Sequence, residues 1–216
     1  GQASANPAES LHTPRVRPTA TDVYRAGEVA AILAHTGSLT DVRGRQRHTI
    51  VATLRYTGMR SKELRTLRQV DVDLAAGRAR VLGKGTQPRD VLLPQALVGI
   101  LACFVEQVRA ALPPSPLLLA NAHPFVTTPL HGFGQEALAR EVELAGLGAG
   151  GAGRHYPHRW RHTYAPELAR RVGCARVSVK DERSRMGLGS FKGLGAAHAI
   201  ARAAAETCEG VAWSEA

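Results

Sequence analysis

The chain has 216 residues, 44% of them hydrophobic, and a mass of 23.0 kDa, so it is long enough for one packed domain. Its net charge of +10 and pI of about 10.4 favour a polyanionic partner, either nucleic acid or an anionic membrane surface. Three cysteines without paired spacing exclude a disulfide framework and a zinc pattern, and the longest apolar run, 96–105, is about half of the roughly 20 residues that a membrane span needs.

The N-terminal segment is rich in Pro, Ala, Ser and Thr and has no hydrophobic period. We expect residues 1–20 to form a flexible leader. The segment also lacks the basic and apolar regions of a secretory signal, which predicts a cytoplasmic protein, associated with the nucleoid if it binds DNA. A helix is then expected over 23–34, capped by Thr21-Asp22 and ended by Gly37-Ser38.

Three arginines, Arg43, Arg45 and Arg47, stand at alternate positions in and beside a predicted loop over 41–46. Such a cluster can contact DNA phosphates and position a duplex without reading its bases. It can equally be a solvated surface cluster, because arginine outnumbers lysine by 24 to 4 in this chain and is therefore weak evidence for a selected role. Both interpretations stay open, and the three arginines are candidate DNA contacts.

The next two predicted helices meet at a turn that holds Arg60. Residues 49–57 have the apolar spacing of a buried helix, and Gly58 is a natural residue to end it. A second helix is expected from Ser61. Arg60 would then be held between two packed helices, although taken alone it could simply form a surface ion pair with Glu63.

Three short β-prone runs, 70–74, 78–82 and 90–93, predict a small antiparallel sheet with tight turns. Lys84 lies between two glycines in the connection from the second run to the third. A phosphate-cradling P-loop is excluded, because the first glycine is one residue too far from Lys84 and neither Ser nor Thr follows that lysine directly. Lys84 is therefore either an exposed turn lysine or a functional residue of another kind.

The second half of the chain is expected to be mainly helical. Helices are predicted over 94–112 and 132–144, and the glycine-alanine stretch over 146–153 is flexible by composition. His123 and His131 are interpreted as loop histidines, because neither has a partner at metal-ligand spacing.

Residues 158–163 form the most distinctive segment of the sequence. On a helix, His158 and Arg161 are three residues apart and lie on one face, against which a phosphate could sit. Trp160 is expected in the core. A histidine in the position of His162 is more often a packing residue than a catalytic one.

Two boxes of residues stand out together: Thr57-Gly58-Met59-Arg60-Ser61-Lys62-Glu63-Leu64 and, later in the chain, His158-x-x-Arg161-His162-Thr163. They resemble two boxes of the tyrosine recombinases, the phage integrase family of site-specific DNA recombinases, and they occur in the same order. The resemblance covers residues 18–164. It implies an α+β, mainly helical catalytic domain with a small antiparallel β-sheet.

The resemblance also implies roles for individual residues in DNA breaking and rejoining without a metal or other cofactor. Two arginines would bind the scissile phosphate, a histidine would move a proton, and a lysine would protonate the leaving 5′-oxygen. The residues that match these catalytic roles are Arg60, Arg161, His158 and Lys84, with Glu63 and His162 as supporting residues. The further candidate DNA contacts are Arg43, Arg45 and Arg47, which lie outside the boxes, and Arg159, which lies inside the second box. The implied partners are double-stranded DNA and other recombinase protomers, with no membrane.

The nucleophile that the family requires is missing from this pattern. In the family the attacking tyrosine follows the second arginine, whereas Tyr164 is the last tyrosine of this sequence, and no Gly-His pair follows it. We also expect the separate helical domain that precedes the catalytic domain in the family to be absent here. We therefore expect residues 21–164 to form a truncated catalytic domain that binds duplex DNA and clamps a phosphate but does not cleave.

Residues 173–205 resemble a different family. Their Ser190-Phe191-Lys192 triplet with its flanking glycines resembles the N-terminal segment of diaminopropionate ammonia-lyase, a fold-type II pyridoxal-phosphate enzyme in which this lysine forms the Schiff base. The resemblance implies Lys192 as a cofactor lysine, but the phosphate cradle and ring-nitrogen partner of such enzymes lie far downstream. We expect 165–216 to be an unrelated or poorly folded tail. The alternatives are a fragment of such a lyase or an inactive fusion product.

Overall fold

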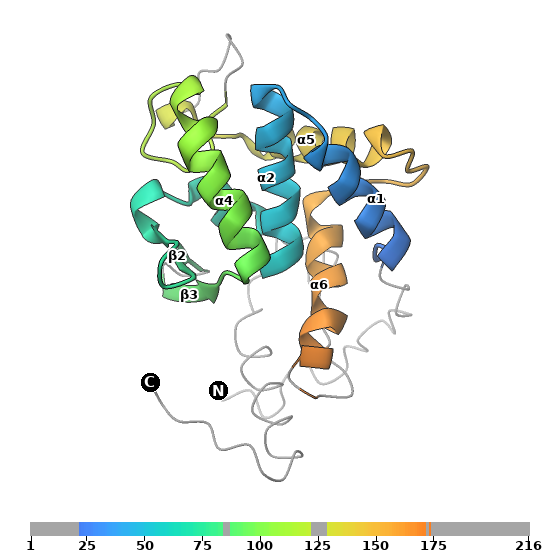
Figure 1. Cartoon of the computed structure of the whole chain (residues 1–216). Helices are drawn as coiled ribbons and strands as arrows, with labels where there is room; N and C mark the ends of the chain where they lie inside the picture. The colour runs from blue at the N-terminus through green and yellow to red at the C-terminus, as the bar shows by residue number, and fades with distance from the viewer. Residues whose placement is uncertain (1–21, 84–86, 122–128, 172, 174–216) are drawn as a thin grey trace, which may run out of the picture.

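The computed structural model describes residues 22–83, 87–121, 129–171 and 173 (Figure 1). The helices in these ranges are α1 (Ala26–Gly37), α2 (Val42–Thr57), α3 (Ser61–Thr66), α4 (Gln95–Gln107), α5 (Gln135–Gly148) and α6 (Pro157–Arg171). The strands are β1 (Val72–Asp73), β2 (Arg78–Leu82) and β3 (Pro88–Leu92), and single 3-10 turns cover Gln69–Asp71, Arg109–Ala111 and Pro129–His131. The mainly helical fold with a small antiparallel sheet is thus confirmed.

Helix α2 is the central element, with α1, α4, α5 and α6 packed around it (Figure 1). Its side chains Ile50, Val51 and Leu54 are fully buried. Removing each such side chain from water contributes roughly 1.5–3 kcal/mol. Because α2 is covered on several sides, the residues at its C-terminal end are fixed by contacts from more than one helix.

A row of threonines lets this partly polar helix occupy the core. Thr49, Thr53 and Thr57 lie four residues apart, and each hydroxyl donates to the backbone carbonyl four residues earlier, at 3.0, 2.7 and 2.6 Å. The buried hydroxyls therefore need no partner from another element.

The prediction of a loop over 41–46 is wrong, because α2 begins at Val42. Asp41 caps the helix: its carboxylate accepts a hydrogen bond from the N–H of Gly44 at 3.2 Å. The first turns of α2 lack an apolar stripe, so hydrophobic spacing gave no sign of them. They are held by this cap and by contacts of their charged side chains with other helices.

The glycine-alanine stretch serves close packing. Helix α5 runs past the end predicted at Leu144 and stops only at Gly148. A side chain on Gly146 would overlap the ring of His155, and one on Gly148 would overlap the ring of His35. These glycines therefore allow close approach of two histidines. The prediction that the whole stretch over 146–153 is flexible was wrong for its first residues, which belong to α5.

The start of α1 was also predicted too early. The helix begins at Ala26, where the carboxylate of Glu28 accepts from the N–H of Arg25 at 2.7 Å. The preceding segment is extended and inserts Tyr24, which is 4% exposed, against Trp160 of α6. That packing holds the segment outside the helix.

The three strands form one antiparallel sheet in the order β1-β2-β3, as predicted. Ala79 pairs with Val91, and both are buried together with Val81 on the inner face. Arg89 pairs with Val81 and precedes Val91 by two residues, so the alternation of a strand directs its side chain to the inner face as well.

Four predictions fall on residues outside the described ranges: the leader, Lys84, the segment that includes His123, and the tail with Lys192. Within the described ranges, no helix is long and apolar enough to cross a membrane.

Candidate functional site

The turn between α2 and α3 is set by a glycine. Gly58 ends α2 in the left-handed region (φ 60°, ψ 20°), which favours a residue without a side chain, and its N–H donates to the carbonyl of Leu54. A Cβ on Gly58 would overlap the ring of Tyr164. The turn therefore lies directly against α6, the helix that carries the second box.

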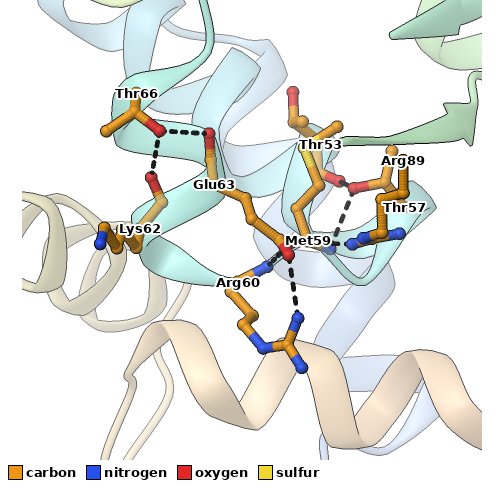
Figure 2. Close-up of polar contacts among 8 residues, drawn as sticks. All are labelled: Thr53, Thr57, Met59, Arg60, Lys62, Glu63, Thr66 and Arg89. Atoms are coloured by element: carbon orange, nitrogen blue, oxygen red, sulfur yellow. Dashed lines mark hydrogen bonds and ion pairs between the residues drawn. The ribbon is translucent and has the colours of Figure 1, made fainter. Parts of the chain in front are cut away.

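Arg60 follows in extended conformation as the residue before α3. Its backbone N–H donates to Oε2 of Glu63 at 2.8 Å, and its Nη1 donates to Oε1 of the same carboxylate at 2.9 Å. The ion pair with Glu63, which was the alternative interpretation of Arg60, does form, but its carboxylate is only 2% exposed, while the Arg60 side chain is 37% exposed. In Figure 2 that side chain points from the turn towards α6, the pale orange helix. Arg60 is therefore anchored to Glu63 through its backbone N–H and through Nη1, while its side chain stays partly exposed.

Glu63 has a second cationic partner, which sequence reasoning missed. Arg89 of β3 donates from Nη2 to Oε2 of Glu63 at 2.8 Å (Figure 2). Burial by itself would raise the pKa of Glu63, but the Arg60 N–H and the guanidiniums of Arg89 and Arg60 outweigh it and hold this pKa below its ordinary value. One buried carboxylate is thus shared by two guanidiniums. The only sequence signal was that Arg89 precedes the β-prone Val91 by two residues.

Helix α6 presents the residues of the second box. The rings of His158 and His162 pack edge to face, with centroids 4.5 Å apart and planes at 81°. His162 is 6% exposed, whereas His158 and Arg161 are half-buried. Trp160 is fully buried and anchors the helix in the core, as predicted.

Arg159 occupies a different environment from its neighbours on α6. Its guanidinium lies 3.9 Å from the ring centroid of Tyr24 and forms ion pairs with Asp22 at 3.1 Å and Glu28 at 3.2 Å. The residue is 6% exposed. These contacts fasten α6 to the start of α1. The DNA contact predicted for Arg159 stays untested, and it would compete with this pairing.

The three arginines at the start of α2 lie in distinct settings. Arg43 is exposed. Arg45 donates to the carbonyl of Thr40 and to the side chain of Gln107, at 3.1 and 2.7 Å. Arg47 pairs with Glu141 of α5 at 2.8 Å, in a partly buried position. Their predicted DNA contacts are likewise untested.

The first box therefore meets α6 at Tyr164, the residue that follows the second box, and the Arg60 side chain points towards the same helix. Lys84 belongs to the residues between β2 and β3 that the structure does not describe, so its place in the site stays a prediction. Among the residues that are described, no three His, Cys, Asp or Glu side chains are grouped to hold a metal ion. The arrangement is suited to binding an anion by guanidinium groups.

Comparison with known proteins identifies the family. The sequence profile of the phage integrase family matches residues 23–177, most of the chain. This chain belongs to the phage integrase family. Tyrosine recombinase XerD of Staphylococcus aureus is 31% identical over 168 residues, which are 77% of this chain and 55% of that protein. XerD of Staphylococcus epidermidis is 30% identical over the same length.

Solved structures of recombinases share the fold. XerA recombinase matches with a TM-score of 0.57 and 28% identity over 74% of this chain and 53% of its own. XerH recombinase, in a complex with its difH substrate, matches with a TM-score of 0.60 and 20% identity over 87% of this chain and 53% of its own. This chain thus spans about half the length of the relatives that it matches.

The phage integrase match extends past Tyr164, where the catalytic domain was predicted to end. Helix α6 continues through that position to Arg171, with Ala165 and Ala169 buried on its inner side. It passes through Pro166, although proline cannot donate the backbone hydrogen bond of that position. The boundary predicted between residues 164 and 165 therefore falls inside a continuous helix.

Proposed function

We propose that this chain binds duplex DNA and clamps one backbone phosphate between Arg60 and Arg161, with His158 beside it. The observation that carries the proposal is the anchored but partly exposed side chain of Arg60, in a turn that packs on α6. Arg161 and His158 stand on that helix, three residues apart. Two guanidiniums that reach one phosphate can each donate two N–H groups to its oxygens.

The charge distribution supports a nucleic-acid partner. Up to Tyr164 the chain has 20 Lys and Arg against 12 Asp and Glu, so most of the net charge of +10 lies in this part. Relatives of the chain are recombinases, the solved XerH structure is bound to its difH substrate, and a solved lambda integrase structure is bound to DNA. We propose that the protein associates with DNA of the nucleoid and with other recombinase protomers.

We further propose that the chain does not cleave DNA with a tyrosine of its own. No tyrosine follows Tyr164 in residues 165–216. Tyr24 is buried, and burial raises the pKa of its hydroxyl well above the ordinary value, which opposes its use as a nucleophile. Arg60, Arg161 and His158 would then bind and polarise a phosphate that no side chain of this chain attacks. The protonation of a leaving oxygen by Lys84 belongs to a reaction that needs a nucleophile from elsewhere.

The binding claim is tested with the double variant Arg60→Ala/Arg161→Ala. The control is Arg78→Ala/Arg140→Ala, which removes the same charge from two exposed positions on β2 and α5. Affinity for a labelled duplex is measured by fluorescence anisotropy over a salt series. We expect the site variant to bind at least about tenfold more weakly than the control, and its salt slope to fall by about one unit because one phosphate contact is lost. Equal losses in both double variants would refute the clamp.

The cleavage claim is tested on a nicked duplex that traps covalent intermediates. We expect no protein-DNA adduct on a denaturing gel from this chain alone. An adduct would show that one of its residues acts as a nucleophile. Mixing the chain with an intact family recombinase then tests whether a tyrosine donated by another protomer fills the vacant role.

The resemblance of residues 173–205 to a pyridoxal-phosphate lyase supplies a second candidate function. It predicts a Schiff base between Lys192 and added pyridoxal phosphate, with a visible absorbance band that Lys192→Ala abolishes. A band that persists in this variant, or no band at all, excludes the lyase candidate without affecting the DNA-binding proposal.

A further inference from the structure

The balance of charge around Glu63 is unusual for an ion pair. Its carboxylate, 2% exposed, is bonded to Arg60 through one oxygen and to Arg89 through the other, at 2.9 and 2.8 Å (Figure 2). Two positive groups therefore surround one negative group. A simple pair of Arg60 and Glu63 would be neutral and would attract a phosphate weakly, whereas the set of three carries a net positive charge.

Besides adding positive charge, Arg89 affects the orientation of the Arg60 guanidinium. Oε2 of Glu63 accepts both from Nη2 of Arg89 and from the backbone N–H of Arg60, each at 2.8 Å. These two bonds fix one edge of the carboxylate, so the remaining oxygen, Oε1, faces Nη1 of Arg60 at 2.9 Å. Burial of Glu63 excludes water that would otherwise compete for these bonds. The guanidinium of Arg60 is thus held by a carboxylate that Arg89 helps to orient.

The two arginines come from different parts of the fold. Arg60 precedes α3, whereas Arg89 lies on β3, in the hairpin whose connecting residues include Lys84. Glu63 therefore joins the α2–α3 turn to this hairpin through a buried contact. Other arginines of the sheet do not share it: Arg80, for example, points outward and pairs with Asp90.

We propose that Arg89 is a positioning residue for the phosphate clamp: through Glu63 it keeps Arg60 oriented and keeps the charge of the clamp positive. This inference rests on the proposed function, because it needs Arg60 to bind phosphate. Arg89 itself does not touch the phosphate in this arrangement. It acts on the ligand only through Glu63 and Arg60.

The test is a double-mutant cycle with the full chain and a labelled duplex. We expect Arg89→Ala to weaken binding about tenfold, as loss of a charge-assisted bond at a buried carboxylate predicts. In the Arg60→Ala background, Arg89→Ala should change affinity by less than about twofold, because the residue through which it acts is already gone. Arg80→Ala on the same hairpin is the matched control for loss of one positive charge.

A second readout separates positioning from general stability. The pKa of the Glu63 carboxyl, followed by NMR on chain with labelled glutamate, should rise in Arg89→Ala and return towards the native value in Arg89→Lys, which restores the charge. A loss of affinity that is the same with and without Arg60 would show a direct phosphate contact and overturn the inference. Equal affinities of Arg89→Ala and Arg80→Ala, or an unchanged pKa of Glu63, would also overturn it.

The cycle distinguishes this inference from the proposed function. If Arg60→Ala alone leaves DNA affinity at the native value, the clamp itself is refuted. If Arg60→Ala weakens binding while Arg89→Ala behaves as the control, the clamp stands and only the role of Arg89 fails.

Discussion

Two arginine clusters in this molecule have opposite balances of charge. At the α2–α3 turn, Arg60 and Arg89 share the single carboxylate of Glu63. Where α6 meets the start of α1, the single guanidinium of Arg159 is shared by Asp22 and Glu28. The first cluster has an excess positive charge and the second an excess negative charge.

Exposure differs in the same direction. The Arg60 side chain is 37% exposed around a buried anion, whereas the Arg159 side chain is 7% exposed between carboxylates that are themselves 50% and 34% exposed. An anion can approach Arg60, while Arg159 is enclosed by its partners and by the ring of Tyr24. Residue type and position in a motif therefore do not by themselves decide which arginine is available to a ligand. The number of carboxylates paired with each arginine matters as well.

The largest effect on stability is expected at the enclosed cluster. Arg159→Ala removes ion pairs with Asp22 and Glu28 and a contact with the face of Tyr24, and it leaves Glu28 bonded to the backbone N–H of Arg25. We expect the free energy of unfolding, measured with urea, to fall by about 3 kcal/mol, at the low end for a buried pair because both carboxylates keep contact with water. The control Arg140→Ala, in an exposed pair with Glu143, should cost less than about 1 kcal/mol. If the folded Arg159→Ala variant loses as much DNA affinity as Arg60→Ala, the assignment of Arg159 to a structural role and of Arg60 to ligand binding is wrong.

A second prediction concerns the contact between the α2–α3 turn and α6. Gly58→Ala puts a side chain at a positive φ and against the ring of Tyr164, so we expect a loss of about 2 to 3 kcal/mol and weaker DNA binding. Gly150→Ala is the matched control, because Gly150 has φ 78° and open space around it. It should show only the backbone strain of about 1 kcal/mol. The free energy of unfolding of both variants is measured with urea. Equal decreases in the two variants would show that the turn does not pack tightly against α6.

A third prediction uses pH to isolate Glu63. Its pKa is lowered in the folded protein, so its ion pairs stabilise the fold above the ordinary pKa of about 4.5, and this contribution is lost as the pH falls through the lowered value. Glu63→Gln should therefore reduce the free energy of unfolding by about 1 to 2 kcal/mol at neutral pH. The difference from the native chain should shrink progressively below about pH 4.5. Glu106→Gln, an exposed change on α4, controls for the loss of one charge. A difference that persists undiminished into acid would contradict the assignment.

Much of this framework was visible in the sequence. Apolar spacing predicted the helices and the sheet, and Gly58 was correctly expected to end α2 because a helix often closes with a glycine in the left-handed region. The place of Arg60 between two helices followed directly. The assignment of Trp160 to the core followed from its apolar position in the motif.

Contacts between distant segments were not visible. Glu63 and Arg89 are 26 residues apart and belong to different elements, so no local spacing connects them. The environment of Arg159 was hidden in the same way, because Asp22 and Glu28 precede it by more than a hundred residues. Helix α6 continues past the boundary expected between residues 164 and 165 and through Pro166, with Ala165 and Ala169 buried against the core.

The smallest expected effect on stability is that of Arg60→Ala, and it completes the comparison. Arg60 is partly exposed, and its removal leaves Glu63 bonded to Arg89 and to the backbone N–H of residue 60. We therefore expect the free energy of unfolding to fall by less than about 1 kcal/mol, while affinity for duplex DNA falls about tenfold. Arg159→Ala should show the reverse, a large loss of stability with native affinity at a temperature where the variant is folded. Stability and DNA affinity are therefore measured for both variants. A loss of stability in Arg60→Ala as large as that in Arg159→Ala would mean that the main role of Arg60 is structural and not ligand binding.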